Sequence, residues 1–357
     1  MKILHVITSL RTGGAEKLMV ELLPRLKQYG YEVDLLLFDG TNTPFREALE
    51  NKGIKVYDLG VGGSVYSIVK LFKLRKYLNG YDFIHTHNTS PQFFVALLKL
   101  IKGRQKLITT EHGGSNRRRS IKGFKYIDKW MYSQYNRIIC IADKTKENLK
   151  SYLNSRKENI VVINNGIEVI KFAKANKATA LNLIAPESKK IIMVAGFRWE
   201  KDQPTVIKSL KYLPEFFHLF LVGDGSRRKE YEELVDRERL TDRVHFLGIR
   251  NDVAELLRAS DYVVMSSHFE GLSLSSVEGM CVGKPFLASN VDGLREVVEG
   301  AGILFPHEDA NVLADEIMKL ENNPEEYKAV AERCLERAKQ YDISKMVDGY
   351  IKVYQSL

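Results

Sequence analysis

Two glutamates flank a glycine turn late in the chain. Glu270 stands directly before Gly271-Leu272 within the segment 266–280, and Glu278 follows two helical turns further on. The apolar run Tyr262–Met265 predicts a buried strand before this turn, and a helix after it would offer backbone N–H groups to a phosphate. One carboxylate could then reach a sugar beside the phosphate, and the other a ribose. Such pairs also occur on solvated helices, but a carboxylate in an apolar turn after a buried strand seldom lacks a functional role.

Two basic residues follow the first apolar run of the second half, which spans residues 190–195. Arg198 and Lys201 stand close together at the end of this expected strand, where they could clamp a pyrophosphate and stabilise charge on a leaving group. Solvated loop charges are the alternative interpretation. The turn Gly223-Asp224-Gly225 follows the run Phe217–Val222 and has the form of a phosphate-binding turn, although glycines also serve tight turns without a ligand.

The first apolar run, Lys2–Ile7, leads into a turn with Gly13 and Gly14. Glycines at this position let the backbone approach a diphosphate, and a tight turn without a ligand would use them as well. Asp39 ends the next expected strand, where a dinucleotide-binding fold carries its ribose-binding acid, so an NAD-dependent dehydrogenase has to be considered. The absence of a Gly-x-Gly-x-x-Gly pattern in the turn counts against that activity.

His112 follows the apolar run that ends at Thr110, so we expect it at the carboxyl edge of the sheet, where such folds bind ligands. Its imidazole could bond a sugar hydroxyl or a phosphate oxygen, or it could cap the next helix. Cations interleaved with aromatic residues come next, and they suit either a solvated helix face or a lipid phosphate at a membrane surface. These cations include Arg117, Arg118, Arg119 and Lys122.

The elements that must position these residues alternate regularly between apolar runs of strand length and amphipathic stretches of helix length. This alternation predicts an α/β fold with mostly parallel sheets covered by helices on both faces. The pattern lapses in residues 167–189, where we expect the interdomain linker, and then restarts. We therefore predict a doubly wound domain at 1–170, a second at 171–342, and a final helix at 343–357 that packs back on the first.

Composition narrows the class of protein. The chain has 357 residues, of which 44% are hydrophobic and 28% charged, and this length favours two domains of a soluble globular protein. It lacks a run of 18 to 20 apolar residues, so we expect a soluble or peripheral protein. Three widely spaced cysteines suggest a reducing cytoplasm. The net charge of +9 fits nucleic acid, an anionic membrane or a phosphorylated substrate, but a nucleic-acid protein would not need an acidic pair in a cleft.

Several motifs in fixed order resemble the retaining nucleotide-sugar glycosyltransferases of family 4, which share the GT-B fold of two Rossmann-like domains facing each other across a cleft. The ordered set spans nearly the whole chain, although each motif is weak by itself. It consists of Gly13-Gly14-Ala15-Glu16, Glu111-His112-Gly113, residues 162–167, Val222-Gly223-Asp224-Gly225, Phe246-Leu247-Gly248 and the pair Glu270 and Glu278.

The resemblance implies a role for each matching residue. Glu278 would hold the hydroxyls of the donor ribose, and Glu270 would contact the transferred sugar. The turn at Gly271 and the backbone amides of Leu272, Ser273 and Leu274 would hold the diphosphate or the sugar. Gly13 and Gly14 would close on the donor from the other domain, Ile249 falls where the base is held, and His112 would contact the sugar.

The resemblance also implies a reaction. Lys201 and Arg198 would neutralise the departing nucleoside diphosphate in place of a metal ion, with no cofactor besides the co-substrate. Arg198 stands three residues before Lys201, whereas the family's arginine stands about five before, so this position departs from the family pattern. We expect retaining transfer of a hexose from a UDP-sugar to a glycan or lipid-linked acceptor, in bacterial surface polysaccharide synthesis. A nucleotide-sugar epimerase or a phosphorylase of the same fold remains the alternative.

Overall fold

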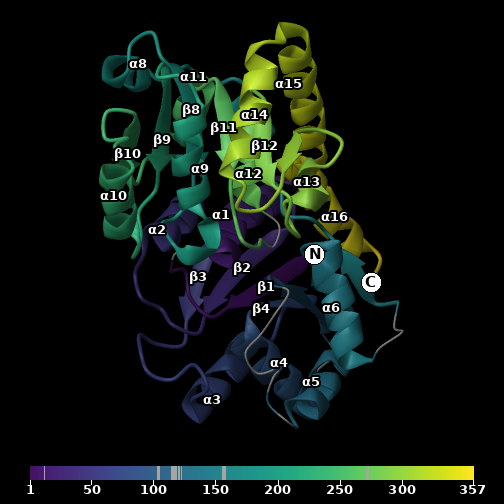
Figure 1. The fold of residues 1–357 in the computed structure, drawn as a ribbon. Helices are drawn as coiled ribbons and strands as arrows, with labels where there is room; N and C mark the ends of the chain where they lie inside the picture. Colours follow the sequence, from purple (N-terminus) through teal and green to yellow (C-terminus); the bar gives the residue numbers. More distant parts are fainter. Residues whose placement is uncertain are drawn as a thin grey trace. The chain divides into compact units, whose positions relative to one another are not determined.

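The computed structural model describes residues 1–357 except 12, 103–104, 114–118, 120, 122, 155–157 and 271–272. The chain forms two compact units (Figure 1). The first comprises Met1–Asn165 with Met346–Leu357, and the second comprises Gly166–Lys345. The sequence-based boundaries were 170/171 and 342/343, a few residues from each of these points.

The first unit contains a parallel sheet of seven strands in the order β3-β2-β1-β4-β5-β6-β7. Its strands are β1 (Lys2–Ile7), β2 (Glu32–Leu37), β3 (Lys55–Asp58), β4 (Phe83–His87), β5 (Lys106–Glu111), β6 (Arg137–Cys140) and β7 (Ile160–Val162). The strand order reverses between β1 and β4, and ligands bind at the carboxyl ends of strands at such a switch point.

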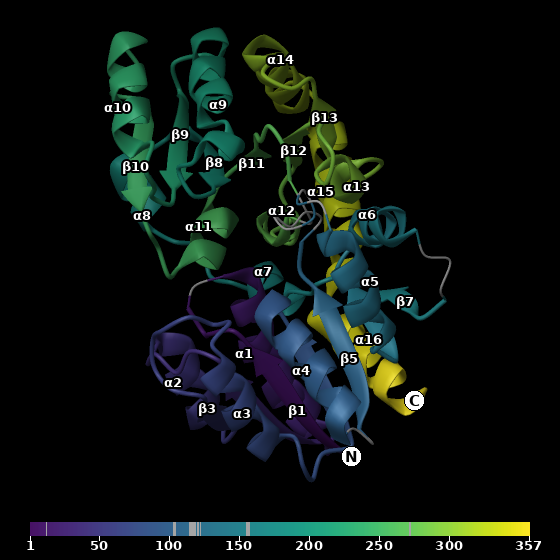
Figure 2. The same ribbon diagram turned by 90° about the horizontal axis from the view of Figure 1, so that it is seen from below.

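Helices connect these strands. They are α1 (Gly14–Gln28), α2 (Pro44–Asn51), α3 (Ile68–Tyr77), α4 (Thr89–Lys102), α5 (Phe124–Ser133), α6 (Asp143–Leu153) and, at the end of the chain, α16 (Ile343–Gln355). Figure 2 shows α3, α4 and α5 on the same side of the first sheet.

Side chains of β1 alternate between the two faces of the sheet, as strand geometry requires. Leu4 and Val6 are buried in one core with residues from α3, α4, α5 and α6. His5, between them, is fully buried on the opposite face, where its Nε2 lies 3.3 Å from the hydroxyl of Tyr354 on α16. The sheet is therefore covered on both faces, by α16 on the side of His5.

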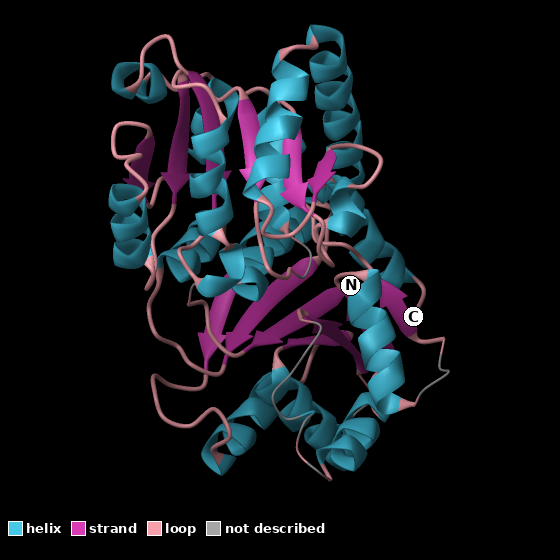
Figure 3. Ribbon diagram, viewed as in Figure 1, coloured by secondary structure: helices cyan, strands magenta, loops and turns pink. Residues whose placement is uncertain are grey.

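The second unit contains a parallel sheet of six strands in the order β10-β9-β8-β11-β12-β13, drawn as arrows in Figure 3. The strands are β8 (Lys189–Val194), β9 (Phe217–Val222), β10 (Val244–Gly248), β11 (Tyr262–Met265), β12 (Phe286–Ser289) and β13 (Ile303–Phe305). Here the order reverses between β8 and β11, which defines a second switch point.

The helices of the second unit are short except near its end. They are α7 (Val169–Ala173), α8 (Ala180–Ile184), α9 (Gln203–Ser209), α10 (Arg228–Arg237), α11 (Val253–Ala259), α12 (Leu274–Met280), α13 (Arg295–Val298), α14 (Ala310–Glu321) and α15 (Pro324–Ala338). Single 3₁₀ turns are η2 (Trp199–Lys201), η3 (Leu210–Tyr212) and η4 (Lys339–Tyr341).

The prediction of a linker at residues 167–189 is wrong. This segment folds as α7 and α8, and its Phe172 and Leu181 are buried in the core of the second unit. Both helices have only five residues, too few for a helical apolar period to be visible in the sequence.

Candidate functional site

Several of the sequence-predicted site residues follow strands that border the two switch points or lie next to a bordering strand. In the second unit, Arg198 and Lys201 lie beyond the end of β8, and Glu270 lies beyond the end of β11, which pairs with β8. In the first unit, Gly13 and Gly14 follow β1, and His112 follows β5. Each set belongs to the carboxyl edge of its own sheet, where doubly wound folds bind ligands.

Lys201 and Glu270 form an ion pair in the second unit. The ammonium of Lys201 contacts Oε1 of Glu270, and the two side chains are only 16% and 10% exposed. Ser267 donates a further hydrogen bond from its hydroxyl to Oε1 of Glu270 at 3.0 Å. The paired switch-point strands thus bring together two residues that stand far apart in the sequence, and a positive group lies beside the turn predicted to hold a phosphate.

Glu278 lies on α12, which packs closely on the sheet. A side chain at Gly279 would place its Cβ 2.7 Å from the ring of Phe286 and 2.8 Å from Val263, so only glycine fits there. Ser273 precedes this helix, and its hydroxyl accepts a hydrogen bond from the backbone N–H of Ser276 at 3.4 Å. The close packing fixes α12, and with it Leu274 and the partly buried Glu278, relative to β11.

Arg198 and Ile249 are exposed. Among the described residues, the guanidinium of Arg198 has no hydrogen bond or ion pair, whereas its carbonyl accepts from the backbone N–H of Lys201 at 3.0 Å. Ile249 follows β10 with 82% of its side chain exposed. Both residues are therefore accessible to a ligand of the second unit. Gly271 and Leu272, also predicted for this site, lie outside the described residues.

The glycines of the two predicted turns differ in what surrounds them. A Cβ on Gly223 would lie 2.1 Å from the carbonyl oxygen of Ala195, and one on Gly225 would lie 2.3 Å from that of Phe197. Glycine is required at these two positions because the turn 223–225 lies against the backbone of residues 195–197. Among the described residues, a Cβ on Gly14 would meet no atom within 4 Å, and one on Gly13 would meet only the carboxylate of Glu16. Packing therefore does not explain Gly14.

His112 belongs to a group of histidines that the sequence did not single out. Its Nε2 lies 3.0 Å from Nδ1 of His87, whose Nε2 lies 3.0 Å from Nδ1 of His5. Burial lowers the pKa of His112 to about 4, so the imidazole is neutral near pH 7. The alternating histidines His85 and His87 in the segment Phe83–His87 are the signal that could have revealed this group.

Arg119 does not present its charge to a surface, contrary to the prediction for this residue. Its guanidinium is 11% exposed and forms a 3.0 Å ion pair with Glu111. Glu111 also accepts hydrogen bonds from Gln92 and from the hydroxyl of Tyr132, both at 2.6 Å. The carboxylate beside His112 thus draws Arg119 inward. Arg117, Arg118 and Lys122, predicted for the same surface, lie outside the described residues.

Asp39 does not have the free carboxylate that a dehydrogenase needs for a ribose. It accepts hydrogen bonds from Thr41, from the backbone N–H of Gly62 at 3.1 Å, and from Arg11 at 3.2 Å. Burial alone would raise the pKa of Asp39, but these bonds outweigh it and hold the pKa below the usual range. The carboxylate therefore organises its own loop.

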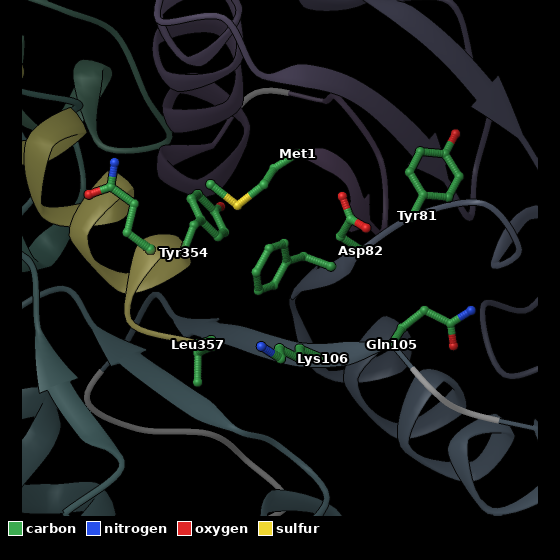
Figure 4. A pocket seen from close by; sticks show the side chains of 9 residues that line it. Met1, Tyr81, Asp82, Gln105, Lys106, Tyr354 and Leu357 are labelled. Carbon is green, nitrogen blue, oxygen red and sulfur yellow. The ribbon is translucent and has the colours of Figure 1, made fainter.

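A pocket of the first unit lies at the opposite edge of the sheet, near the amino ends of β4 and β5 (Figure 4). Its lining includes Met1, Asp82, Phe83, Lys106 and, from α16, Tyr354. The predicted site residues that the structure describes do not line this pocket. Among the described residues, no helix is both long and apolar enough to cross a membrane.

The folds, the two switch points and the ordered motifs agree with matches to two family models. Residues 12–170 match the model described as Glycosyltransferase Family 4, and residues 175–339 match Glycosyl transferases group 1. The chain belongs to the glycosyltransferases of the family 4 type, with the GT-B fold.

Similar proteins extend over most of the chain. An uncharacterized glycosyltransferase of Methanocaldococcus jannaschii, MJ1178, is 29% identical, with 97% of this chain and 95% of the relative covered. The Escherichia coli enzyme UDP-Gal:alpha-D-GlcNAc-diphosphoundecaprenol alpha-1,3-galactosyltransferase is 26% identical over 82% of this chain and 80% of its own. Anabaena Alr3699/HepE, solved in complex with UDP, superposes with a TM-score of 0.86 at 22% identity, and both chains are covered completely.

Proposed function

We propose that this glycosyltransferase moves a hexose from a UDP-sugar to a glycan or lipid-linked acceptor, with retention of anomeric configuration and without a metal ion. The observation that carries this proposal is the Lys201–Glu270 pair beside α12 at the switch point of the second unit. The name of the galactosyltransferase relative includes a UDP-sugar donor and a lipid diphosphate acceptor, and the HepE structure contains UDP. Both support a uridine nucleotide in the donor, and the lipid-linked acceptor of the galactosyltransferase supports a role in polysaccharide synthesis.

The residues of the second unit take complementary parts in donor binding. Glu278 holds the ribose hydroxyls, Ile249 contacts the base, and Glu270 accepts a hydrogen bond from a hydroxyl of the sugar. The backbone amides from Gly271 to Leu274 hold the diphosphate. In the first unit, His112 bonds an oxygen of the sugar, and Gly14 leaves room for a ligand to approach the backbone.

Positive charge replaces a metal ion in the transfer step. The acceptor hydroxyl oxygen forms a bond to the anomeric carbon while the bond from that carbon to the β-phosphate oxygen breaks. The bond breaks on the same face on which the new bond forms, so configuration is retained, and the acceptor proton passes to the departing phosphate. Lys201 neutralises charge that develops on the nucleoside diphosphate, with help from the exposed Arg198. No other cofactor takes part.

We also propose that the protein works at the inner face of the cell membrane. On α5, Tyr126 is 80% exposed and Ile127 is 43% exposed, near the exposed Lys129. On α3, Ile68 and Phe72 are exposed by 65% and 67%, and the chain contains no acidic residue between positions 59 and 81. Exposed apolar side chains near lysines, as on these two helices, suit an anionic lipid surface.

A donor-hydrolysis screen tests the proposed function. Purified protein is incubated with UDP-, GDP-, dTDP-, CDP- and ADP-sugars, first alone and then with lipid-linked acceptors. Release of one nucleoside diphosphate, stimulated by an acceptor, supports the proposal. Epimerised donor without net release would indicate the epimerase alternative. In a separate incubation with a glycan and inorganic phosphate, formation of sugar 1-phosphate would indicate a phosphorylase.

A further inference from the structure

A continuous chain of hydrogen-bonding groups runs through the first unit from His112 to α16. It passes through His87 and His5 to the hydroxyl of Tyr354, which lies 3.3 Å from Nε2 of His5 and 2.6 Å from Nδ1 of His85. From there, Nε2 of His85 lies 2.8 Å from the hydroxyl of Thr110. We call these six residues the histidine chain.

The imidazoles of the histidine chain are neutral. His5, His85 and His87 are completely buried, and burial lowers the pKa of His5 to about 3 and those of His85 and His87 well below the usual value. Burial also raises the pKa of Tyr354 well above its usual value, so the hydroxyl keeps its proton. Each imidazole therefore has one N–H donor and one bare nitrogen acceptor.

Each imidazole has one donor and one acceptor, and the hydroxyl of Tyr354 has one proton to donate. When every link of the chain is made and this buried proton is paired, all bonds point the same way. If Tyr354 donates to His5, then His5 donates to His87, and His87 donates to Nε2 of His112. The proton of His112 then sits on Nδ1. If Tyr354 donates to His85 instead, every bond reverses and Nδ1 of His112 is a bare acceptor. This Nδ1 is buried and has no partner among the described residues, so it is the open end of the chain.

The far end of the chain decides its direction. Among the described residues, the hydroxyl of Thr110 contacts only Nε2 of His85 and the hydroxyl of Tyr350, the latter at 3.4 Å. With Thr110 donating to His85, Tyr350 can donate to Thr110 and both hydroxyl protons are paired. In the reverse direction His85 donates to Thr110, and one of the two buried hydroxyl protons has no acceptor. An unpaired buried polar group is costly, so the first direction is favoured.

We propose that the histidine chain holds His112 as the tautomer with its proton on Nδ1, and that Tyr354 is the positioning residue that transmits this preference from α16. His112 then meets its ligand as a neutral hydrogen-bond donor, suited to a sugar or phosphate oxygen. This role rests on the proposed function of His112 in sugar binding, whereas the tautomer itself does not.

Three of these histidines also lie close enough together to be considered as a metal site, since one nitrogen each of His5, His85 and His87 lies within 4.8 Å of the other two. Every ring nitrogen of the three is already paired within the histidine chain. The hydrogen-bonded chain therefore accounts for all of them without an ion.

Nitrogen NMR of the full chain labelled with ¹⁵N-histidine reads the tautomer directly. The chain has eight histidines, and a His112→Gln spectrum assigns the signals of His112 by difference. We expect a protonated Nδ1 and a bare Nε2 for His112 in the unmodified protein. In Tyr354→Phe the link between His85 and His5 is lost, so His112 should change to a mixture of both tautomers.

Tyr350→Phe is the matched control, because it removes a buried hydroxyl from the same helix. Thr110 can still donate to His85 in that variant, so His112 should keep its single tautomer. Three results would each overturn the inference. They are the same tautomer change of His112 in both variants, a bare Nδ1 of His112 in the unmodified protein, and stoichiometric metal in the purified protein. If the tautomers behave as expected but no sugar nucleotide is hydrolysed, the proposed function fails and the histidine chain stands.

Kinetics then test whether the tautomer matters. With only about half of His112 in the donor form, kcat/KM for donor hydrolysis should fall about twofold in Tyr354→Phe. Tyr350→Phe should leave it unchanged. A change shared by both variants would show that the tyrosines act only through stability.

Discussion

The Lys201–Glu270 pair gives the sharpest quantitative prediction. Lys201→Ala removes the positive partner of the Glu270 carboxylate, whose side chain is only 10% exposed. The hydrogen bond from the hydroxyl of Ser267 to this carboxylate remains. Breaking a buried ion pair in this way costs about 3 kcal/mol, at the lower end of the usual range because the Lys201 side chain is still 16% exposed. In a unit of this size the loss corresponds to a fall in Tm of about 6–12 °C.

A double-mutant cycle separates the pair from its surroundings. Lys201→Ala/Glu270→Ala should recover much of the stability lost in Lys201→Ala, because the buried charge is gone. The matched control is the surface pair of Lys319 and Glu316, whose lysine is 70% exposed, and it should show no measurable coupling. Calorimetric unfolding measures all variants. Additive effects of Lys201 and Glu270 would refute the argument that these two charges depend on each other.

The same substitution has a catalytic consequence. If Lys201 stabilises the departing diphosphate, kcat for donor hydrolysis falls by about 10²–10³-fold in Lys201→Ala, as for the loss of one charge-stabilising donor. The assay is run well below the Tm of the variant, so that unfolding does not contribute. A loss confined to KM would mean that Lys201 binds the donor equally in the ground state and the transition state.

Two further perturbations test the glycine turns and the buried histidines. Gly223→Ala should destabilise the second unit, since its Cβ would lie 2.1 Å from the carbonyl oxygen of Ala195 at a φ of +135°. Gly14→Ala should leave Tm unchanged and weaken donor binding. Equal Tm losses in the two variants would contradict the assigned roles. Acid should destabilise the first unit. In the folded state the pKa values of His5 and His112 are near 3 and 4, below the unfolded value of about 6.5. As the pH falls from 6.5 towards 4, the unfolded state therefore takes up protons before the folded state does. Each such histidine should cost about 1.4 kcal/mol by pH 5.5, and a Tm that is flat from pH 7 to 5 would show that these groups are protonated in the folded state.

The regular alternation of apolar runs with amphipathic stretches made most of the fold predictable from the sequence. The runs Lys2–Ile7, Phe217–Val222 and Tyr262–Met265 are strands with the expected bounds, because each is a mostly apolar segment before a glycine turn or polar turn. The helix α15 was missed although Asn323 and Pro324 give it a strong start, with the side chain of Asn323 accepting from the N–H of Glu326.

Pairings across the sheets could not be predicted in the same way. Glu270 and Lys201 were each identified, but their contact depends on β8 pairing with β11, which no local pattern encodes. Arg119 was predicted at a surface because charge runs are usually solvated, and its inward position depends on Glu111 from another element. The histidine chain likewise joins β1, β4, β5 and α16, which are separate segments of the sequence.

Nucleotide binding by the second unit tests the central claim most directly. Calorimetric titration with UDP, GDP, dTDP, CDP, ADP and NAD is compared between the unmodified protein, Glu278→Ala and the control Glu325→Ala, which removes an exposed carboxylate from α15. We expect UDP to bind most tightly, Glu278→Ala to weaken that binding, and Glu325→Ala to leave it intact. Binding of NAD alone, or UDP binding that does not depend on Glu278, would contradict the account.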